Sequence, residues 1–253
     1  MAGITVVKVR RNGVGQFEQL TDEFLSALEF LIKLSAEGGK MAALCGACVR
    51  VLPVQRAAIL IQERDVGLQP WATSDSVAAR VEAVQATAGQ GPAVDAVVAG
   101  VPVLVADLAE TDVRWPGFAD ELNRVAATGS VVTGSMVAVP LQLGVVCFGV
   151  LDLYRADPGK PEPYVISAGL HIADLVIAQL VAGSAKSVPA AAQWWDQPLT
   201  SRTIHQAAGI VLAQLDIRAP DAYARLRAYA FAHGLSLAEV AALVVDNRIR
   251  FDN

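Results

Sequence analysis

The sequence has few of the residues that build disulfide frameworks, metal sites and membrane spans. It contains three cysteines and three histidines in 253 residues, and only 18% of its residues are charged. Three unevenly spaced cysteines are too few for a disulfide framework. Although 54% of the residues are hydrophobic, no apolar run reaches the ~18 to 20 residues that cross a bilayer, and the first residues lack the apolar core of a secretory signal. We therefore expect a soluble cytoplasmic protein without membrane contacts.

The formal net charge of −5 is unevenly divided along the chain. Residues 1–194 hold 14 Lys and Arg against 19 Asp and Glu, whereas residues 195–253 hold six Arg and six acids and are neutral. Neither part has the basic excess that usually marks a nucleic-acid-binding surface. Any contact with a polyanion must therefore come from individually placed arginines.

Apolar periodicity predicts an α+β part followed by an all-helical part. Steps of three and four predict helices, and short apolar runs predict strands. The expected helices of the first part are at 17–34, 41–51, 76–88, 113–127 and 161–183, and the expected strands at 57–62, 68–75, 101–107 and 136–155, the last run turning near Gly144. Strands separated by helices and finished by a hairpin indicate an α+β sheet domain. The expected organisation is a flexible tail over 1–16, a sheet domain over 17–185, a linker over 186–198 and a three-helix domain over 199–248.

The cysteines are interpreted as structural. Cys45 and Cys48 form a lone C-x-x-C on a predicted helix with no second pair, which favours burial over zinc or dithiol chemistry. Cys147 lies in a predicted strand and is interpreted as a small apolar filler. The sequence offers no set of nucleophile, base and orienter and no metal-ligand cluster. We therefore expect neither enzyme activity nor a bound cofactor or metal.

Three segments of the first part match a known family. They are ATSD at 72–75, QGPAVDAVVAGVPVLVADLAETDVRWPGFA at 90–119 and VAVPLQLGVVCFGVLDLYRADPG at 137–159. Together, over about residues 17–185, they resemble the GAF domain of bacterial sensory regulators. The resemblance implies a central antiparallel sheet with helices on one side, a ligand pocket on the other, and terminal helices that form a dimeric bundle.

The resemblance does not name the ligand of that pocket. Ala93 and Ala96 stand where close actinobacterial relatives usually have cysteine, which removes a redox-thiol mechanism, and the signature of cyclic-nucleotide binders is missing. The effector is therefore an unknown small molecule. The candidate pocket residues are Asp107, Arg114 and Trp115, as a lid over a polar ligand; the alternative is that Trp115 is a packing anchor and Arg114 a solvated or capping residue.

The helical part matches a second family. The matching residues are Ile204, Gln206 to Val211, Ala222, Tyr223, Leu226, Arg227, Ala230, Leu237, Val240 and Ala241. This pattern resembles the ANTAR domain, the three-helix RNA-binding module of transcription antitermination regulators. The resemblance implies a homodimer that binds paired stem-loops in a nascent transcript.

The residues themselves support a small helical bundle with a polar face. Ile204, Val211 and Leu215 form an apolar stripe flanked by Ala207 and Ala208. A second helix starts at Pro220 and ends at Gly234, and Ser236 to Glu239 is a capping box that opens a third. The candidate RNA-binding residues are Arg202, His205, Gln206, Gly209, Arg225, Arg227 and Phe231. Arginines bind phosphate, aromatic and Arg planes stack on bases, and a mid-helix glycine allows close approach of a ligand backbone.

Alternatives remain open for several of these residues. Gly209 could instead seat a neighbouring helix, and Phe231 could belong to a dimer interface. Ala208 stands where the family has lysine, so one phosphate contact is missing and the salt slope of RNA binding falls by about 0.7 to 0.9. The leading hypothesis is a signal-responsive antitermination regulator. The alternative is a protein-interaction or dimerisation regulator whose ANTAR-like tail no longer binds RNA.

Overall fold

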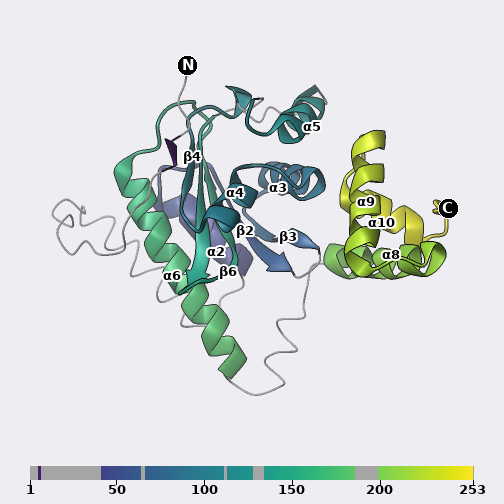
Figure 1. Ribbon diagram of the computed structural model, residues 1–253. Coiled ribbons are helices and arrows are strands. Elements are labelled where there is room, and N and C mark those ends of the chain that lie inside the picture. The colour runs from purple at the N-terminus through teal and green to yellow at the C-terminus, as the bar shows by residue number, and fades with distance from the viewer. Residues whose placement is uncertain are drawn as a thin grey trace.

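A central sheet with helices on both faces and a separate group of three helices make up the molecule (Figure 1). The structure is a computed structural model that describes residues 5–6, 41–63, 66–110, 113–127, 134–185 and 199–252. We refer to residues 5–185 as the sheet domain and to residues 199–252 as the helical domain. The predicted helix at 17–34 and the predicted linker at 186–198 lie outside the described residues.

The sheet is antiparallel and has six strands in the order β1-β4-β5-β6-β2-β3. The strands are β1 (Thr5–Val6), β2 (Arg56–Glu63), β3 (Gly67–Thr73), β4 (Val103–Val105), β5 (Met136–Leu143) and β6 (Val146–Tyr154). Each predicted strand run contains a strand, and β5 and β6 turn at Gly144, whose φ of +63° suits glycine. Thr5–Val6, inside the predicted tail, pair with β4.

Alternate side chains of each strand enter two separate cores, as the period of two in a strand requires. Ile59, Val139 and Leu151 pack under α2 (Met41–Val51) and α6 (Pro163–Ala185). Their strand neighbours, among them Leu60 and Val150, pack under the helices of the opposite face. These helices are α3 (Ser76–Ala88), α4 (Pro92–Ala99) and α5 (Pro116–Ala127), with the 3-10 turn η1 (Leu108–Glu110) before α5. Helices therefore cover both faces of the sheet, where the resemblance implied one.

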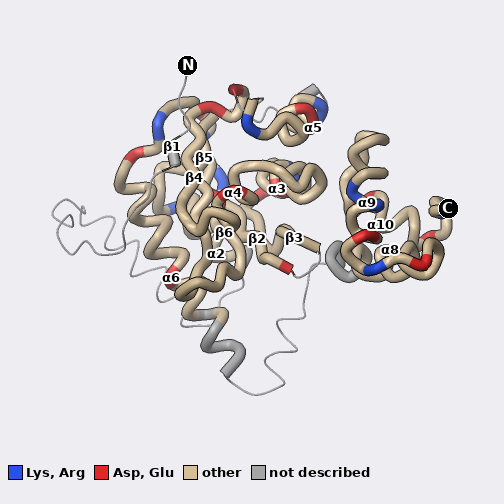
Figure 2. The backbone as a smooth tube through the Cα atoms, viewed as in Figure 1, with Lys and Arg blue, Asp and Glu red and all other residues tan. Residues whose placement is uncertain are grey.

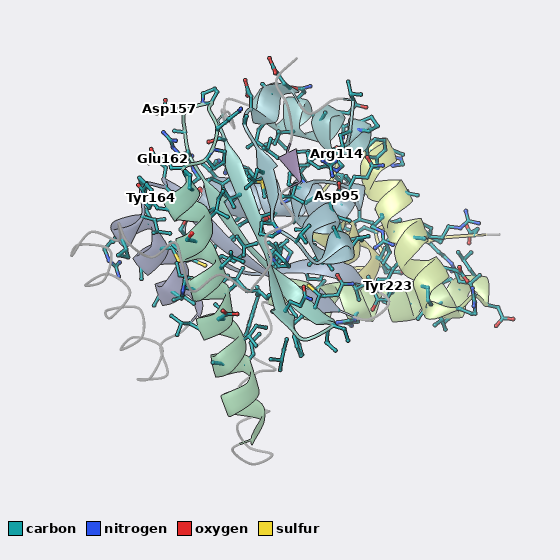
Figure 3. All side chains as sticks on the ribbon, turned by 60° about the vertical axis from the view of Figure 1, so that its left-hand side comes forward. Asp95, Arg114, Asp157, Glu162, Tyr164 and Tyr223 are labelled. Carbon is teal, nitrogen blue, oxygen red and sulfur yellow. The ribbon has the colours of Figure 1, made fainter. Side chains whose placement is uncertain are left out.

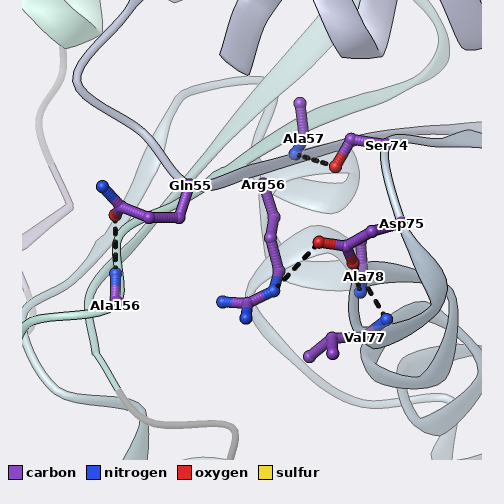
Figure 4. Close-up of polar contacts among 8 residues, drawn as sticks. All are labelled: Gln55, Arg56, Ala57, Ser74, Asp75, Val77, Ala78 and Ala156. Carbon is purple, nitrogen blue, oxygen red and sulfur yellow. Dashed lines mark hydrogen bonds and ion pairs between the residues drawn. The ribbon is translucent and has the colours of Figure 1, made fainter. Parts of the chain in front are cut away.

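The start of α3 is fixed to the sheet by Asp75 (Figure 4). Its carboxylate Oδ1 accepts hydrogen bonds from the backbone N–H groups of Val77 and Ala78, at 2.9 and 2.8 Å, which satisfies two free donors of the first turn. Its Oδ2 lies 3.2 Å from Nε of Arg56 on β2. The cap and the ion pair together hold the start of α3 at the sheet, and α3 carries buried polar side chains that are described below.

The helical domain consists of α8 (Leu199–Leu215), α9 (Ala219–His233) and α10 (Leu237–Val245) around one apolar core. The expected stripe is buried, including Val211 with no exposure, and α9 ends at Gly234 in the left-handed conformation. The capping box at Ser236 and Glu239 is formed. Within the described residues no single helix is long and apolar enough to cross a membrane; α9 and α10, bent by 110°, pass only as a pair by length and composition.

Candidate functional site

A cluster of polar side chains is completely buried between α3 and the sheet. It consists of Glu82 and Gln85 on α3 and Asp152 and Tyr154 on β6, and we call it the carboxyl cluster. The Tyr154 hydroxyl donates to Glu82 Oε1, and Gln85 Nε2 donates to Glu82 Oε2 at 2.8 Å and to Asp152 Oδ2 at 3.1 Å. Asp152 Oδ1 has no partner. Gln85 Oε1 accepts from the N–H of Ala93 at 2.9 Å, which joins the cluster to α4.

Burial changes the protonation of this cluster. Loss of solvation raises the pKa of Glu82 to about 7, although the hydrogen bond from Tyr154 favours the charged form. Desolvation, and then the neighbouring charge of Glu82, hold the pKa of Asp152 well above its usual range. Two buried carboxyl groups in one dry space do not both ionise, because each charge raises the cost of the other. The cluster therefore retains a proton at neutral pH.

The sequence contained signals for this cluster that the motif analysis did not use. Asp152 is a charged residue inside an apolar strand that is buried on both faces, and buried carboxylates are rare unless they are paired. On α3, Ala78, Glu82 and Gln85 recur at steps of four and three on the buried face. That the polar side chains of α3 meet those of β6 is visible only in the tertiary structure.

The candidate pocket residues lie at the start of α5 and next to α4. Arg114 contacts Asp95 of α4 through Nη2 and Nε, at 2.7 and 2.9 Å from the same oxygen, and the two side chains face each other in Figure 3. The Arg114 guanidinium lies 4.9 Å from the ring centroid of Trp115. Trp115 is 3% exposed, packs edge-on against Phe118 and leaves its Nε1 without a partner. The ligand-lid role stays a prediction.

Asp107 is held locally, away from this pair of contacts. Its Oδ1 accepts from the N–H of Ala109 at 2.9 Å and so caps the η1 turn. Within the described residues, no hydrogen bond, ion pair or ring contact joins Asp107 to Arg114 or Trp115. Of the three candidate pocket residues, the structure therefore brings only Arg114 and Trp115 together.

Replacing Arg114 with alanine is expected to lower the free energy of unfolding by about 1 kcal/mol or less. The reason is that both partners of the Arg114–Asp95 pair are 33% exposed, so water screens it. Urea unfolding of Arg114→Ala, Asp95→Asn and the double variant measures this. The loss in the double variant should be smaller than the sum of the two single losses, because each single variant already removes the pair. A loss of several kcal/mol would contradict the screened-pair interpretation.

The two cysteines of the C-x-x-C segment are buried, as the sequence predicts. Cys45 and Cys48 have no exposed surface, and Cys147 on β6 is partly buried. Burial raises the pKa of the Cys48 thiol to about 12 and raises that of Cys45 as well, so neither forms the reactive thiolate at neutral pH. Among the described residues, no group of three or more His, Cys, Asp or Glu is placed to hold a metal ion.

Some candidate RNA-binding residues of the helical domain face solvent. Gln206, Gly209 and Arg225 are exposed. A Cβ added at Gly209 would meet nothing within 4 Å, so among the described residues no neighbouring helix is seated on it. Helix α9 carries both aspartate and arginine and α10 carries a glutamate, so charges of both signs are present in the helical domain (Figure 2). The side chain of Arg202 lies outside the described residues.

The other candidates contact the sheet domain. His205 Nε2 lies 2.8 Å from Glu63 Oε2 at the end of β2, an ion-pair distance without hydrogen-bond alignment, and His205 Nδ1 lies 2.5 Å from the Tyr223 hydroxyl. Arg227 Nη1 donates to the backbone carbonyl of Val66 at 2.7 Å. Burial lowers the pKa of Arg227, which still leaves a guanidinium charged at neutral pH. Phe231, 38% exposed, lies 5.9 Å from the Arg124 guanidinium of α5.

Two further contacts complete this interface. The side chain of Val66, in the turn between β2 and β3, is 2% exposed and belongs to the core of the helical domain. The N–H of Leu237, the first residue of α10, donates to Thr87 Oγ1 of α3 at 3.2 Å, in a buried position. We call the contacts of Glu63, Val66, Thr87 and Arg124 with the helical domain the docking interface. The sequence patterns did not predict it, because its partners are 107 to 161 residues apart in the chain.

Ala208 is 3% exposed and belongs to the core of the helical domain. This agrees with its predicted place beside the apolar stripe. A lysine at that position would have to extend its ammonium out of the core along its aliphatic stem.

Comparison with known families identifies both parts of the chain. The model of the GAF domain matches residues 42–188, and the model of the ANTAR domain matches residues 196–245. The chain belongs to the GAF domain family, with a C-terminal ANTAR domain. Because these are sensory and regulatory domains, the chain is a signal-responsive ANTAR regulator. Comparison with curated proteins finds no match.

Solved structures agree with the fold of the sheet domain. The GAF domain of an Acinetobacter phosphoenolpyruvate-protein phosphotransferase aligns with a TM-score of 0.50 at 10% identity, over 66% of this chain and 98% of that one. The GAF domain of a phosphoenolpyruvate-protein phosphotransferase from Coxiella burnetii aligns with a TM-score of 0.49 at 13% identity, over 65% of this chain and 96% of that one. A free methionine-R-sulfoxide reductase from Neisseria meningitidis, in complex with its substrate, aligns with a TM-score of 0.48 at 14% identity, over 65% of this chain and 93% of that one. At these identities the likeness concerns the fold alone.

Proposed function

We propose that this protein is an RNA-binding transcription antitermination regulator in which the GAF domain controls the ANTAR domain. ANTAR domains in general bind RNA, and GAF domains bind small molecules. In this proposal the helical domain binds paired stem-loops of a nascent transcript and prevents a terminator hairpin. An unidentified small molecule, bound by the sheet domain, sets the response.

The observation that carries the proposal is the open polar face of α8. Gln206 and Gly209 are exposed on it, and no described atom occupies the space beside Gly209. A glycine in the middle of a helix costs roughly 1 kcal/mol relative to alanine, and no neighbouring helix within the described residues offers a packing reason for it. An RNA sugar or phosphate that approaches the backbone there supplies one.

The proposed active form is a homodimer. Paired stem-loops present two similar binding sites, and a two-fold symmetric dimer presents two identical ANTAR domains. The N-terminal helix predicted for the dimeric bundle lies outside the described residues. The proposal of a homodimer therefore rests on the two similar stem-loops of the RNA target. Light scattering of the full chain, alone and with a two-stem-loop RNA, measures the stoichiometry; one chain per RNA would contradict it.

Arg225→Gln is expected to weaken binding to a two-stem-loop RNA and to reduce the salt slope of log Kd by about 0.7 to 0.9, the value for one phosphate contact. Arg225 is suited to this test because it is exposed and outside the docking interface. Fluorescence anisotropy of the full chain across salt concentrations measures the slope. Arg250→Gln is the matched control, because it makes the same change at an exposed arginine beyond the ANTAR match.

The titration also tests the alternative function. A scrambled RNA without stem-loops is titrated in parallel. Equal weak binding to both RNAs, unaffected by Arg225→Gln, would mean that the helical domain serves protein docking or dimerisation instead. The contacts of His205, Arg227 and Phe231 with the sheet domain are the observation that favours that alternative.

A further inference from the structure

The docking interface uses the same side chains that the proposed function assigns to RNA. Of the seven candidate RNA-binding residues, three contact the sheet domain: His205, Arg227 and Phe231. The sheet-domain groups they meet are of the kinds that RNA offers. Glu63 presents a carboxylate to His205 and Val66 a carbonyl oxygen to Arg227, and phosphate oxygens would bind to the same donors. Arg124 lies against the ring of Phe231 on which a base would stack.

The interface is also built from three separate elements of the sheet domain. The turn between β2 and β3 contributes Val66, whose side chain is buried in the core of the helical domain. α3 contributes Thr87, which accepts the buried hydrogen bond from Leu237. α5 contributes Arg124, whose Cδ would lie 3.1 Å from a Cβ added at Gly234. Both the backbone and the apolar core of the helical domain are therefore engaged.

We propose that the docking interface is an autoinhibitory contact: the docked sheet domain covers part of the RNA-binding face, and stable RNA binding requires its release. This inference rests on the proposed function, because it concerns the regulation of the same site. RNA and the sheet domain then compete for His205, Arg227 and Phe231. The apparent Kd for RNA exceeds the intrinsic Kd by the reciprocal of the undocked fraction.

The individual contacts are weak enough for the equilibrium to shift. The contact of Glu63 with His205 and the cation–π contact of Arg124 lie at partly exposed positions, where each contributes a factor of about two to five to an equilibrium constant. Helix α3 carries Glu82 and Gln85 of the carboxyl cluster and, two residues after Gln85, Thr87 of the interface. A ligand that binds the sheet domain and displaces α3 would shift the docked population through Thr87.

The test measures RNA binding and docking separately in the full chain. Fluorescence anisotropy with a two-stem-loop RNA gives the apparent Kd, and hydrogen exchange at Leu237 reports docking. The Leu237 amide is the first of α10 and has no acceptor within its own helix, so Thr87 Oγ1 is its partner. The released variants are Glu63→Gln/Arg124→Ala, which alters the sheet domain alone, and Thr87→Val, which removes the acceptor with little change of shape. Thr87→Ser keeps the hydroxyl.

We expect both released variants to bind the RNA about 2- to 10-fold more tightly than the wild type, as loss of one or two weak contacts implies. Faster exchange at Leu237 reports undocking in Glu63→Gln/Arg124→Ala, because that variant keeps the Thr87 acceptor. Thr87→Ser and the control Glu162→Gln/Lys160→Ala should match the wild type. The control makes the same charge changes at exposed residues, and Glu162 lies across the sheet domain from the helical domain (Figure 3).

Each contrary outcome has a distinct meaning. Faster exchange at Leu237 without tighter binding, in a chain that binds the stem-loop RNA specifically, would overturn autoinhibition and leave the proposed function intact. Unchanged exchange at Leu237 in Glu63→Gln/Arg124→Ala would also overturn it, because the docked state would then not depend on these contacts. If no variant distinguishes the stem-loop RNA from the scrambled RNA while Leu237 exchanges faster, the proposed function fails and the inference fails with it.

Discussion

The free energy of unfolding is expected to fall as the pH rises from about 4.5 to 7, and Glu82→Gln is expected to remove a large part of that slope. The usual pKa of Glu82, 4.5, is raised to about 7 in the folded protein. Between these values the folded chain binds a proton that the unfolded chain has released, so stability is fully present below pH 4.5 and is lost toward pH 7. The loss through Glu82 is on the order of 3 kcal/mol, since one pKa unit corresponds to about 1.4 kcal/mol.

Denaturant unfolding at intervals from pH 4.5 to 7.5 measures this slope. Asp152 also has a raised pKa, so Glu82→Gln should leave a residual slope that Glu82→Gln/Asp152→Asn abolishes. Subtracting each variant's profile from the wild-type profile cancels the carboxylates elsewhere in the chain. Glu162→Gln, at an exposed residue, should retain the wild-type slope. A wild-type slope in Glu82→Gln would show that Glu82 does not hold the proton.

Local sequence patterns predicted much of the fold because the forces behind them are local. Short apolar runs located the strands, and the capping box at Ser236 located the start of α10 within its own four residues. Helix α4 is not among the predicted helices, because glycine and proline at 91 and 92 by themselves indicate a break in the chain. In the structure, a proline in the first turn marks the start of an eight-residue helix, and Gly100, in the left-handed conformation, marks its end.

The candidate site was less predictable because its contacts join distant segments. On a helical wheel, Arg227 falls at the edge of the apolar face of its helix and Phe231 falls outside it, and the exposure of both side chains agrees with these positions. The wheel could not show that Val66 and Arg124 would meet them, because periodicity describes one element and not what packs on it. The same applies to Glu82 and Asp152, which Gln85 joins only when α3 packs on the sheet.

Leu226→Ala is expected to unfold the helical domain while the sheet domain stays folded. Leu226 has no exposed surface and lies in the single core that holds α8, α9 and α10 together. Truncation of a buried leucine costs about 2 to 5 kcal/mol, and a module of about 50 residues has only a few kcal/mol to lose. Loss of helical signal in circular dichroism and fast hydrogen exchange across α8 to α10, with β5 and β6 still protected, are the expected result.

The same variant separates the contributions of the two domains. Leu212→Ala is the matched control, because Leu212 is on α8 but 37% exposed, and it should change stability by less than about 0.5 kcal/mol, as surface substitutions do. The docking interface leads to a second expected result, because Val66 of the sheet domain belongs to the same core as Leu226. Unfolding of the helical domain should therefore also expose Val66 and speed exchange in the turn between β2 and β3. Protection of that turn in Leu226→Ala would mean that the two domains are not coupled through Val66.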